Sequence, residues 1–436
     1  MHGTPLERFQ ELLRIPTMAG HDEAFALFAA TLARLYPAVH AALELEVVGA
    51  HSLLFRWVGS GEADPLVLMA HQDVVPASDE GWTHPPFGAE LTGEGDEQVL
   101  WSRGSLDDKG PLVAVLEAVE RLLAAGFTPA RDVYLSFGHD EETYGTGAES
   151  IVALLASRGV RAALVLDEGG AIVDDAFPGV TVPVAAVGVS EKGIANVMLS
   201  VRQEGGHAST PPRLAATVRL ARAITRLEKR QFPTTMSPAI ERMVLAVGRH
   251  AHGALGILFR GVRVTRPLVT AAFARVSDET RAMVRTTMAV TELRGSAAAN
   301  VLAESASATV NVRIAVGSSV AEAERHIRRA IDDPRVSVSV EHASEPSPIS
   351  PSDGAAWDAI VRSIEHAHPG TAVVPYVMYA ASDARHFTRI SDHVYRFFPF
   401  HLTREERATL HAIDERIHVA TWLQGIAFYE ELVRTF

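Results

Sequence analysis

Short apolar runs alternate with helix-like segments over the first part of the chain. The run PLVLMA at 65–70 is continuously apolar, as expected for a strand that is buried on both faces of a sheet. Between Pro111 and Gly126 the apolar positions 112, 115, 116, 119, 122 and 123 have helical spacing, and these two residues mark the helix ends. Further strands are expected at 132–137 and 162–166, with a helix at 149–159 between them. The pattern predicts an α/β sandwich whose strands are joined by crossover helices.

From about residue 188 the pattern changes to strands of partly alternating polarity, separated by single amphipathic helices. Strands are expected within 187–210 and at 307–316 and 336–342, and helices at 214–229 and 320–331. Two such strand–helix–strand units predict a separate α+β layer, from about 188 to 344, with one open sheet face. Residues from about 231 to 295 fit neither unit, and we interpret them as an insertion of mixed structure.

The chain then returns to its first pattern. The Pro- and Ser-rich stretch SEPSPISPSDG at 344–354 is typical of a linker, and a helix, a strand and a helix are expected after it. We therefore predict one domain built from residues 1–187 and 345–436, and an inserted domain at 188–344. A chain of 436 residues is long enough for two or three domains.

Composition narrows the possible functions. The chain has 53 acidic and 40 basic residues, and its net charge of −13 argues against a nucleic-acid partner or an anionic membrane. The start MHGTPLERFQELLRIP predicts an amphipathic helix and not a secretory signal, and the apolar runs are too short to span a bilayer, so we expect a cytoplasmic protein. Because there is no cysteine, a bound metal must be held by His, Asp and Glu.

Acidic residues and histidines gather where the predicted strands end. They are His71 after the first strand, HDEETYGT at 139–146 after the second, Asp167 and Glu168 after the third, and Asp107 and Asp108 in a Gly-bounded loop. In an open α/β sheet the carboxyl ends of neighbouring strands meet at one edge, where ligands collect. Several carboxylates at one edge repel one another unless a cation compensates them. This favours zinc, manganese or cobalt, as one ion or as a pair about 3.5–4 Å apart.

Each candidate also has a structural interpretation. Asp108 could cap the helix that follows it. Asp73, two residues after His71, could form a turn or hold the His71 ring in one tautomer. His207, in GGHAST, could belong to a simple turn, and Arg313, in VNVRI, could form a salt bridge on a sheet face. It is the repetition of acidic clusters at equivalent strand ends that favours a metal centre.

Six motifs in order carry a resemblance to a known family. HQDVVP, WSRGSLDDKG, HDEETYGTG, LDEGG, GGHAST and HAIDERI, between about residues 65 and 425, resemble the di-zinc family of aminoacylase, carboxypeptidase S, carboxypeptidase G and succinyl-diaminopimelate desuccinylase. The stretch VSEKG and the long insertion are most similar to the branch of carboxypeptidase S and N-fatty-acyl-amino-acid synthase/hydrolase. The resemblance implies an αβα catalytic domain of the phosphorylase/hydrolase-like, zinc-peptidase type. It also implies an inserted ferredoxin-like lid through which two chains form a homodimer.

The resemblance further implies a centre with two divalent ions, most simply zinc, with cobalt or manganese possible. The implied ligands are His71, Asp107 and Asp167 for the first ion and Asp107, Glu142 and His411 for the second, with Glu168 as the alternative to Asp167. Glu141 would be the general base that takes a proton from a water shared by the ions, and Asp73 would hold His71. His207 of the other subunit would stabilise the oxyanion, and Arg313 and Asn300 would grip the substrate carboxylate.

These implications predict a zinc-dependent hydrolase that cuts the amide bond of N-acyl amino acids or short peptides with a free C-terminal carboxylate. A two-metal phosphoesterase would share the carboxylate-rich centre but should carry more basic groups for phosphate. A non-catalytic metal-binding or ligand-binding module is a second alternative, although the expected base Glu141 is present.

Overall fold

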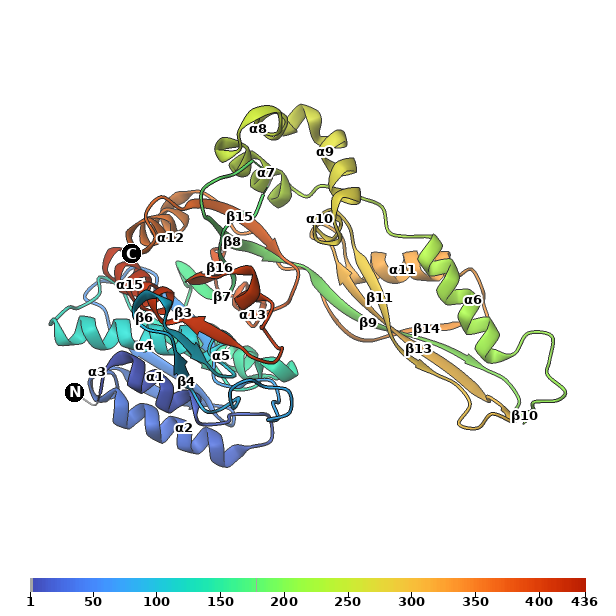
Figure 1. Ribbon diagram of the computed structural model, residues 1–436, viewed down its shortest axis with the longest axis horizontal. Helices are drawn as coiled ribbons and strands as arrows, with labels where there is room; N and C mark the ends of the chain where they lie inside the picture. The colour runs from blue at the N-terminus through green and yellow to red at the C-terminus, as the bar shows by residue number, and fades with distance from the viewer. Residues whose placement is uncertain (1–2, 178) are drawn as a thin grey trace.

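The computed structural model describes residues 3–177 and 179–436 of the chain. Figure 1 shows a broad layered unit, which holds both chain ends, and an elongated unit built on long strands. The helix predicted at the start of the chain is α1 (Pro5–Leu13), and residues 1 and 2 of that prediction lie outside the described residues. The helix predicted at 111–126 is α4 (Lys109–Ala124).

An eight-stranded mixed sheet forms the centre of the layered unit. Its strands are β1 (Glu44–Val48), β2 (Ser52–Trp57), β3 (Leu66–His71), β6 (Val133–Gly138), β7 (Leu164–Val173), β8 (Val184–Glu191), β15 (Ala372–Met378) and β16 (Val394–His401). They lie in the order β1-β2-β6-β3-β7-β16-β8-β15. The strands β6, β3, β7 and β16 are parallel neighbours, whereas β1 and β2 add antiparallel strands at one edge. The parallel strands therefore end at a common edge.

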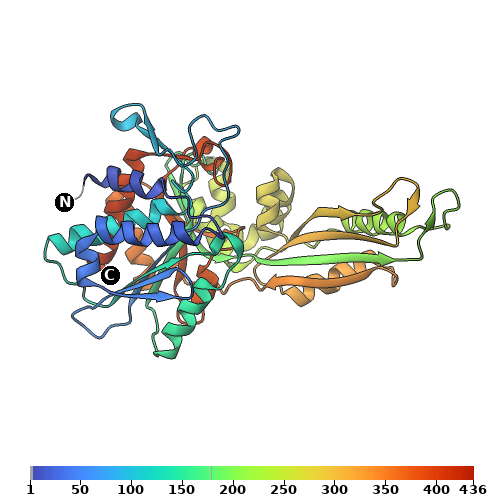
Figure 2. The same ribbon diagram turned by 90° about the horizontal axis from the view of Figure 1, so that it is seen from below.

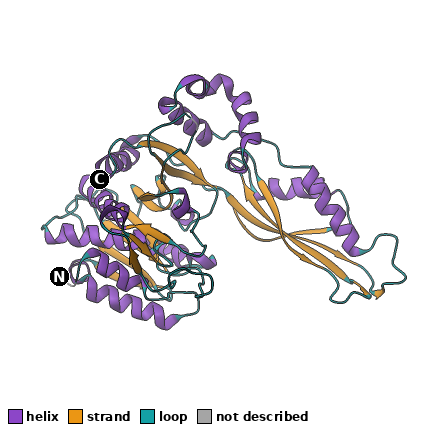
Figure 3. Ribbon diagram, viewed as in Figure 1, coloured by secondary structure: helices purple, strands orange, loops and turns teal. Residues whose placement is uncertain are grey.

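Helices cover both faces of this sheet (Figure 3). One face carries α1, α2 (Asp22–Leu35), α3 (Pro37–Ala42), α4, α12 (Gly354–Ala367) and α15 (Val419–Thr435), and the other carries α5 (Gly147–Ser157) and α13 (Ala384–Phe387). Along β3, Leu66 and Leu68 belong to the larger apolar core, while Val67 and Met69 belong to the core beneath α5 and α13. Side chains alternate along a strand, so a continuous apolar run is needed to bury both faces. The predicted αβα sandwich is confirmed.

The elongated unit is a four-stranded antiparallel sheet with two helices on one face. Its elements are β9 (Gly193–Arg202), α6 (Ala216–Lys229), β11 (Thr287–Arg294), β13 (Ser305–Ile314), α11 (Val320–Ile331) and β14 (Ser337–Ser344), with the strand order β11-β13-β9-β14. This order and direction are those of a ferredoxin-like unit. Residues of β13 alternate between burial against the helices and partial exposure on the open face. One open face is what the alternating polarity predicts.

The segment interpreted as an insertion divides between the two units. It contains α7 (Pro238–His250), α8 (Gly253–Arg260), α9 (Val262–Val276) and α10 (Asp278–Met283). It ends with β11, which belongs to the four-stranded sheet of the elongated unit. Met243 and Val247 of α7 pack into the large core of the layered unit. The predicted boundary at 187/188 falls inside β8, and only Lys192 separates β8 from β9.

A small antiparallel sheet joins two distant parts of the chain. It consists of β4 (Glu90–Thr92), β5 (Val99–Trp101) and β17 (Arg416–His418), in the order β17-β5-β4. This pairing brings the C-terminal HAIDERI stretch next to the loop that begins at Ser102. Among the described residues, no helix combines the length and the apolarity needed to cross a membrane. The cytoplasmic location stays a prediction.

The core of the elongated unit offers a test of this packing. Ile327 of α11 is completely buried between the two helices and the four-stranded sheet of the elongated unit. We expect Ile327→Ala to lower the free energy of unfolding by about 2–5 kcal/mol, because it deletes buried methyl groups and leaves a cavity. Urea denaturation followed by circular dichroism measures this change.

The matched control is Ile257→Ala in α8, where 69% of the side chain is exposed. This substitution should change the free energy of unfolding by no more than about 0.5 kcal/mol. Equal effects of the two substitutions would contradict the placement of α11.

Candidate metal centre

Three neighbouring strands deliver side chains to one edge of the large sheet. His71 is the last residue of β3, the acidic stretch 139–142 follows β6, and Glu168 lies within β7. The sheet order β6-β3-β7 places these strands side by side. The loop before α4 adds Asp107, and the loop before β17 adds His411 from the far end of the chain.

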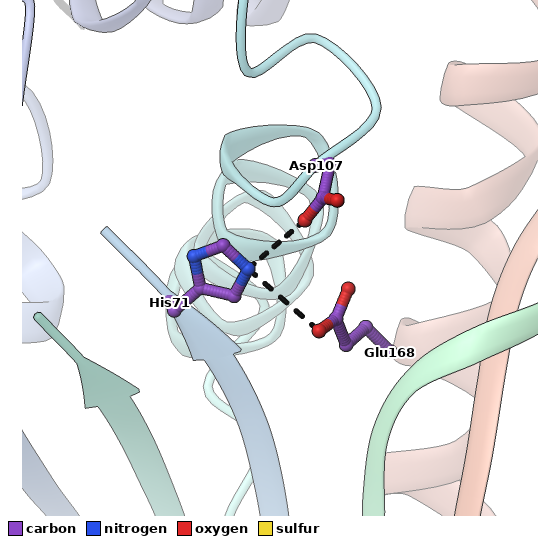
Figure 4. Close-up of side chains that lie close together, drawn as sticks. All are labelled: His71, Asp107 and Glu168. Atoms are coloured by element: carbon purple, nitrogen blue, oxygen red, sulfur yellow. Dashed lines mark hydrogen bonds and ion pairs between the residues drawn. The ribbon is translucent and has the colours of Figure 1, made fainter. Parts of the chain in front are cut away.

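His71, Asp107 and Glu168 form the first of two groups that could hold a metal ion (Figure 4). The His71 Nε2 atom lies 2.9 Å from Asp107 Oδ1 and 3.7 Å from Glu168 Oε1. Figure 4 shows the two carboxylates converging on the same ring nitrogen. One imidazole nitrogen and two carboxylates are a common donor set for a divalent transition metal.

Asp107, Glu142 and His411 form the second group. The His411 Nε2 atom lies 2.9 Å from Asp107 Oδ2 and 3.2 Å from Glu142 Oε2. The two oxygens of Asp107 therefore face different histidines, one in each group. A carboxylate in this position can bridge two ions.

Asp73 organises the surroundings of both groups. Its carboxylate accepts hydrogen bonds from the backbone N–H groups of Glu141 (3.3 Å) and Glu142 (3.0 Å). His71 Nδ1 lies 2.9 Å from the Asp73 backbone oxygen and 3.4 Å from its carboxylate. Asp73 thus holds the His71 ring, and it also fixes the loop that carries Glu141 and Glu142.

The structure brings Glu168, and not Asp167, into the first group. Neighbouring residues on a strand point to opposite faces, so only one of the pair can face Asp107. The Asp167 carboxylate instead accepts a hydrogen bond of 2.8 Å from the backbone N–H of Ala384. The prediction of Asp167 as a ligand disagrees with this geometry, and the alternative residue occupies the place.

Asp108 also departs from its simple structural interpretation. It holds the N-cap position of α4 but makes no capping hydrogen bond. Its Oδ2 atom accepts a hydrogen bond of 3.0 Å from the backbone N–H of His71. Asp108 therefore ties the loop before α4 to the end of β3.

Electrostatics at this edge reflect the crowding of acidic groups. Burial raises the pKa of Glu168 well above its usual range, and the charge of Asp107 raises it further. Burial would likewise raise the pKa of Asp107, but hydrogen bonds from His411 and His71 outweigh it and lower the pKa. Hydrogen bonds to Asp107 and Glu142 raise the pKa of His411 to about 10. The carboxylates thus favour any positive charge placed among them.

A buried polar atom supports a metal at this place. The Oε1 atom of Glu142 is buried and has no hydrogen-bond partner among the described residues. A buried carboxylate oxygen without a partner is costly, and a cation would satisfy it. The oxygen and nitrogen donors of both groups fit zinc, cobalt or manganese.

Asp383 is a residue of this site that the sequence interpretation missed. It is buried just after β15, in the stretch SDAR, and burial together with Asp167 raises its pKa to about 7. Its carboxylate lies beside Gly138, at the end of β6. An acidic residue after another strand of the large sheet was the available signal.

The structure does not bring His207 and Asn300 to this centre. His207 lies in β10 (Gly206–His207), which pairs with β12 (Val301–Leu302) at the far end of the elongated unit (Figures 1 and 2). Both His207 and Asn300 are exposed. Arg313 lies near the opposite end of β13 from this tip. At the usual rise of a strand, its Cα atom is about 30 Å from that of Ser305, where β13 begins beside the tip.

Comparison with known proteins places these features in a family context. Residues 67–435 match the sequence pattern of Peptidase family M20/M25/M40. N-fatty-acyl-amino acid synthase/hydrolase PM20D1 of Homo sapiens is 35% identical over 441 residues, which cover 98% of this chain and 87% of the human protein. Carboxypeptidase S of Saccharomyces cerevisiae is 31% identical over 456 residues, covering 92% of this chain and 76% of the yeast protein.

Among solved structures, the M20 family metallo-carboxypeptidase Sso-CP2 of Sulfolobus solfataricus has a TM-score of 0.73 to this chain. The two sequences are 16% identical, and the superposition covers 99% of each. This likeness shows a common fold.

The choice between Glu168 and Asp167 can be tested directly. If each ligand group holds one zinc ion, Glu168→Gln should lower the zinc content from two ions per chain towards one, because a neutral amide is a poor ligand for the first group. Asp167→Asn should keep both ions, since its amide oxygen can still accept the hydrogen bond from Ala384. Elemental analysis after dialysis against a weak chelator measures both, and loss of zinc from Asp167→Asn alone would contradict the assignment.

Proposed function

This chain belongs to peptidase family M20/M25/M40 and is a metallohydrolase, and from this we propose that it hydrolyses the amide bond of N-acyl amino acids or short peptides with a free C-terminal carboxylate. The observation that carries the proposal is the pair of ligand groups joined by Asp107. The two relatives are named as an N-fatty-acyl-amino acid synthase/hydrolase and a carboxypeptidase. An N-acyl amino acid and the C-terminal end of a peptide share one chemical feature, an amide bond next to a free carboxylate. No observation favours a phosphoesterase.

We assign the ligands of two ions from the geometry of the groups. His71, Asp107 and Glu168 would hold one ion, and Asp107, Glu142 and His411 would hold the other. Zinc is the first choice because it accepts this mixture of nitrogen and carboxylate ligands. When bound, zinc supplies Lewis-acid chemistry that lowers the pKa of a water to roughly 7 and polarises a carbonyl.

Glu141 is the proposed general base. It neighbours the ligand Glu142 but belongs to neither ligand group, so its carboxylate is available for proton transfer. Burial, followed by the nearby charge of Asp383, raises the pKa of Glu141, although His71 opposes this. A carboxylate with a raised pKa can take a proton from water and deliver it to the leaving amine nitrogen.

Arg313 is the proposed partner of the substrate carboxylate. Its Nε atom donates a hydrogen bond of 3.2 Å to Asn311 Oδ1, and no carboxylate pairs with it among the described residues. Its guanidinium fork is therefore available, and arginine pairs with a carboxylate through two parallel hydrogen bonds. Asn300 lies in the turn before β12, at the far end of the elongated unit, too far from Arg313 to grip the same carboxylate from the same chain.

A homodimer would bring His207 and Asn300 of one chain to the metal centre of the other. Both lie at the exposed tip of the elongated unit, so a second copy could insert this tip beside the metal centre of its partner. Among the described residues, no strand pairs with the outer side of the edge strand β11, and Leu293 on it is 67% exposed. An unpaired edge strand with apolar residues favours association. His207 would then donate to the oxyanion across the interface.

The experiment that tests this function is a release assay with N-acyl amino acids, dipeptides and a generic phosphate ester. We expect amino-acid release from some of the amides, none from the phosphate ester, and loss of release after chelation. Glu141→Gln should lower kcat by about 10²–10⁴ with the metal content unchanged, because only proton transfer is lost.

Glu149→Gln is the matched control, since Glu149 lies on α5 with about half of its side chain exposed. Its kcat should equal that of the wild type. A Glu141→Gln variant with wild-type kcat would exclude Glu141 as the base.

Mixing two inactive variants tests the role of His207. His207→Ala and Glu141→Gln should each be inactive, but a re-equilibrated mixture should regain roughly a quarter of wild-type activity. Half of the dimers would be hybrids, and each hybrid of a symmetric dimer has one complete site. A mixture that stays inactive while size measurements show hybrid dimers would contradict catalysis across the interface.

A further inference from the structure

Two loops that carry metal ligands from opposite ends of the chain are locked together by a buried ion pair. Arg103 lies four residues before Asp107, and Glu415 lies four residues after His411. The side chains are 3% and 0% exposed, and Arg103 Nη1 lies 2.5 Å from Glu415 Oε2. No role in the chemistry proposed above requires either residue.

Each partner of this pair also holds the loop of the other. The Oε1 atom of Glu415 accepts hydrogen bonds from the backbone N–H groups of Leu106 (2.8 Å) and Asp107 (3.2 Å). Arg103 Nη2 donates a hydrogen bond of 2.9 Å to the backbone oxygen of Ala412, the residue after His411. Glu415 therefore binds the backbone at and before the ligand Asp107, and Arg103 binds the backbone just after the ligand His411.

The surroundings of the pair leave it little freedom. The backbone N–H of Ser102 donates to the backbone oxygen of Glu415, at the end of the pairing between β5 and β17. The Arg103 guanidinium lies over the Trp82 ring, 5.2 Å from its centre. Thr83 donates hydrogen bonds from its backbone and its hydroxyl to Asp414, so the loop before β17 is fixed on a second side.

We propose that Arg103 and Glu415 are positioning residues, which together form a clamp that sets the separation of Asp107 and His411 and thereby the affinity of the second ligand group for its ion. The proposal rests on the metal centre proposed above. Asp107 and His411 lie far apart in the chain, and neither is fixed by a strand of the large sheet. The clamp joins their loops through buried side chains, in addition to the backbone pairing of β5 and β17. Residues that orient metal ligands change metal affinity by about 10–100-fold when they are replaced.

The test compares three substitutions in the full-length protein. Glu415→Gln keeps an oxygen for the two backbone donors but removes the ion pair, and Arg103→Lys keeps the charge but not the two-point contact. Glu117→Gln is the matched control, because Glu117 is also completely buried and pairs with an arginine, Arg8, outside the two ligand loops. The measurements are zinc bound per chain across a series of chelator concentrations, and the melting temperature without metal.

We expect Glu415→Gln to lose one of two zinc ions at chelator concentrations about 10–100-fold below those that strip the wild type. Arg103→Lys should show the same selective loss of zinc to a smaller extent. This variant tests the clamp by itself if Glu415→Gln does not fold. Glu117→Gln should lower the melting temperature without changing zinc binding.

Wild-type zinc affinity in Arg103→Lys and Glu415→Gln would overturn the clamp, and so would an equal loss of zinc in Glu117→Gln. A wild-type chain that binds no divalent ion would overturn the metal centre itself, and the clamp with it. The two failures are thus distinguished by the behaviour of the wild type.

Discussion

Largely buried carboxylates crowd one edge of the large sheet, and their mutual repulsion has to be compensated before the surrounding fold is stable. Asp107, Glu168 and Glu142 converge there, and Glu142 keeps an oxygen without a partner. A buried ion costs several kilocalories per mole unless an opposite charge compensates it. The two histidines can compensate only in part, and they use the same ring nitrogens that would otherwise bind metal. Two divalent cations would remove the conflict, which explains why the chain gathers acidic groups at a place where they destabilise the fold.

The fold meets this constraint with contributions from separate parts of the chain. The parallel strands β6, β3 and β7 set the spacing of the first ligands, and α4 begins just after Asp107. The chain forms the elongated unit after β8 and re-enters the layered unit at α12. In this last part, β17 pairs with β5, and His411 lies beside Asp107. Asp73 and Asp108 bind backbone N–H groups and hold the loops between these elements. The centre is therefore assembled from the whole layered unit.

Much of this arrangement follows from the sequence because the relevant signals are local. The continuous apolar run of β3 and the helical spacing of α4 predicted the sandwich, and the alternating polarity of β13 predicted an open sheet face. The resemblance to a known family implied which residues would meet, with Glu168 only as the alternative to Asp167. Whether Asp167 or Glu168 turns towards Asp107 depends on the register of β7, which neighbouring strands decide. The packing of α7 on the large core and the Arg103–Glu415 contact link distant segments, so no local pattern could predict them.

We propose that Asp107 bridges two divalent ions, one in each ligand group. Crystals grown with zinc and measured on both sides of the zinc absorption edge would test it most directly, because anomalous scattering locates zinc alone. Two bridged ions should give two peaks on opposite sides of the Asp107 carboxylate, one beside His71 and Glu168 and the other beside Glu142 and His411. A single peak, or peaks away from Asp107 in a fully active preparation, would contradict it.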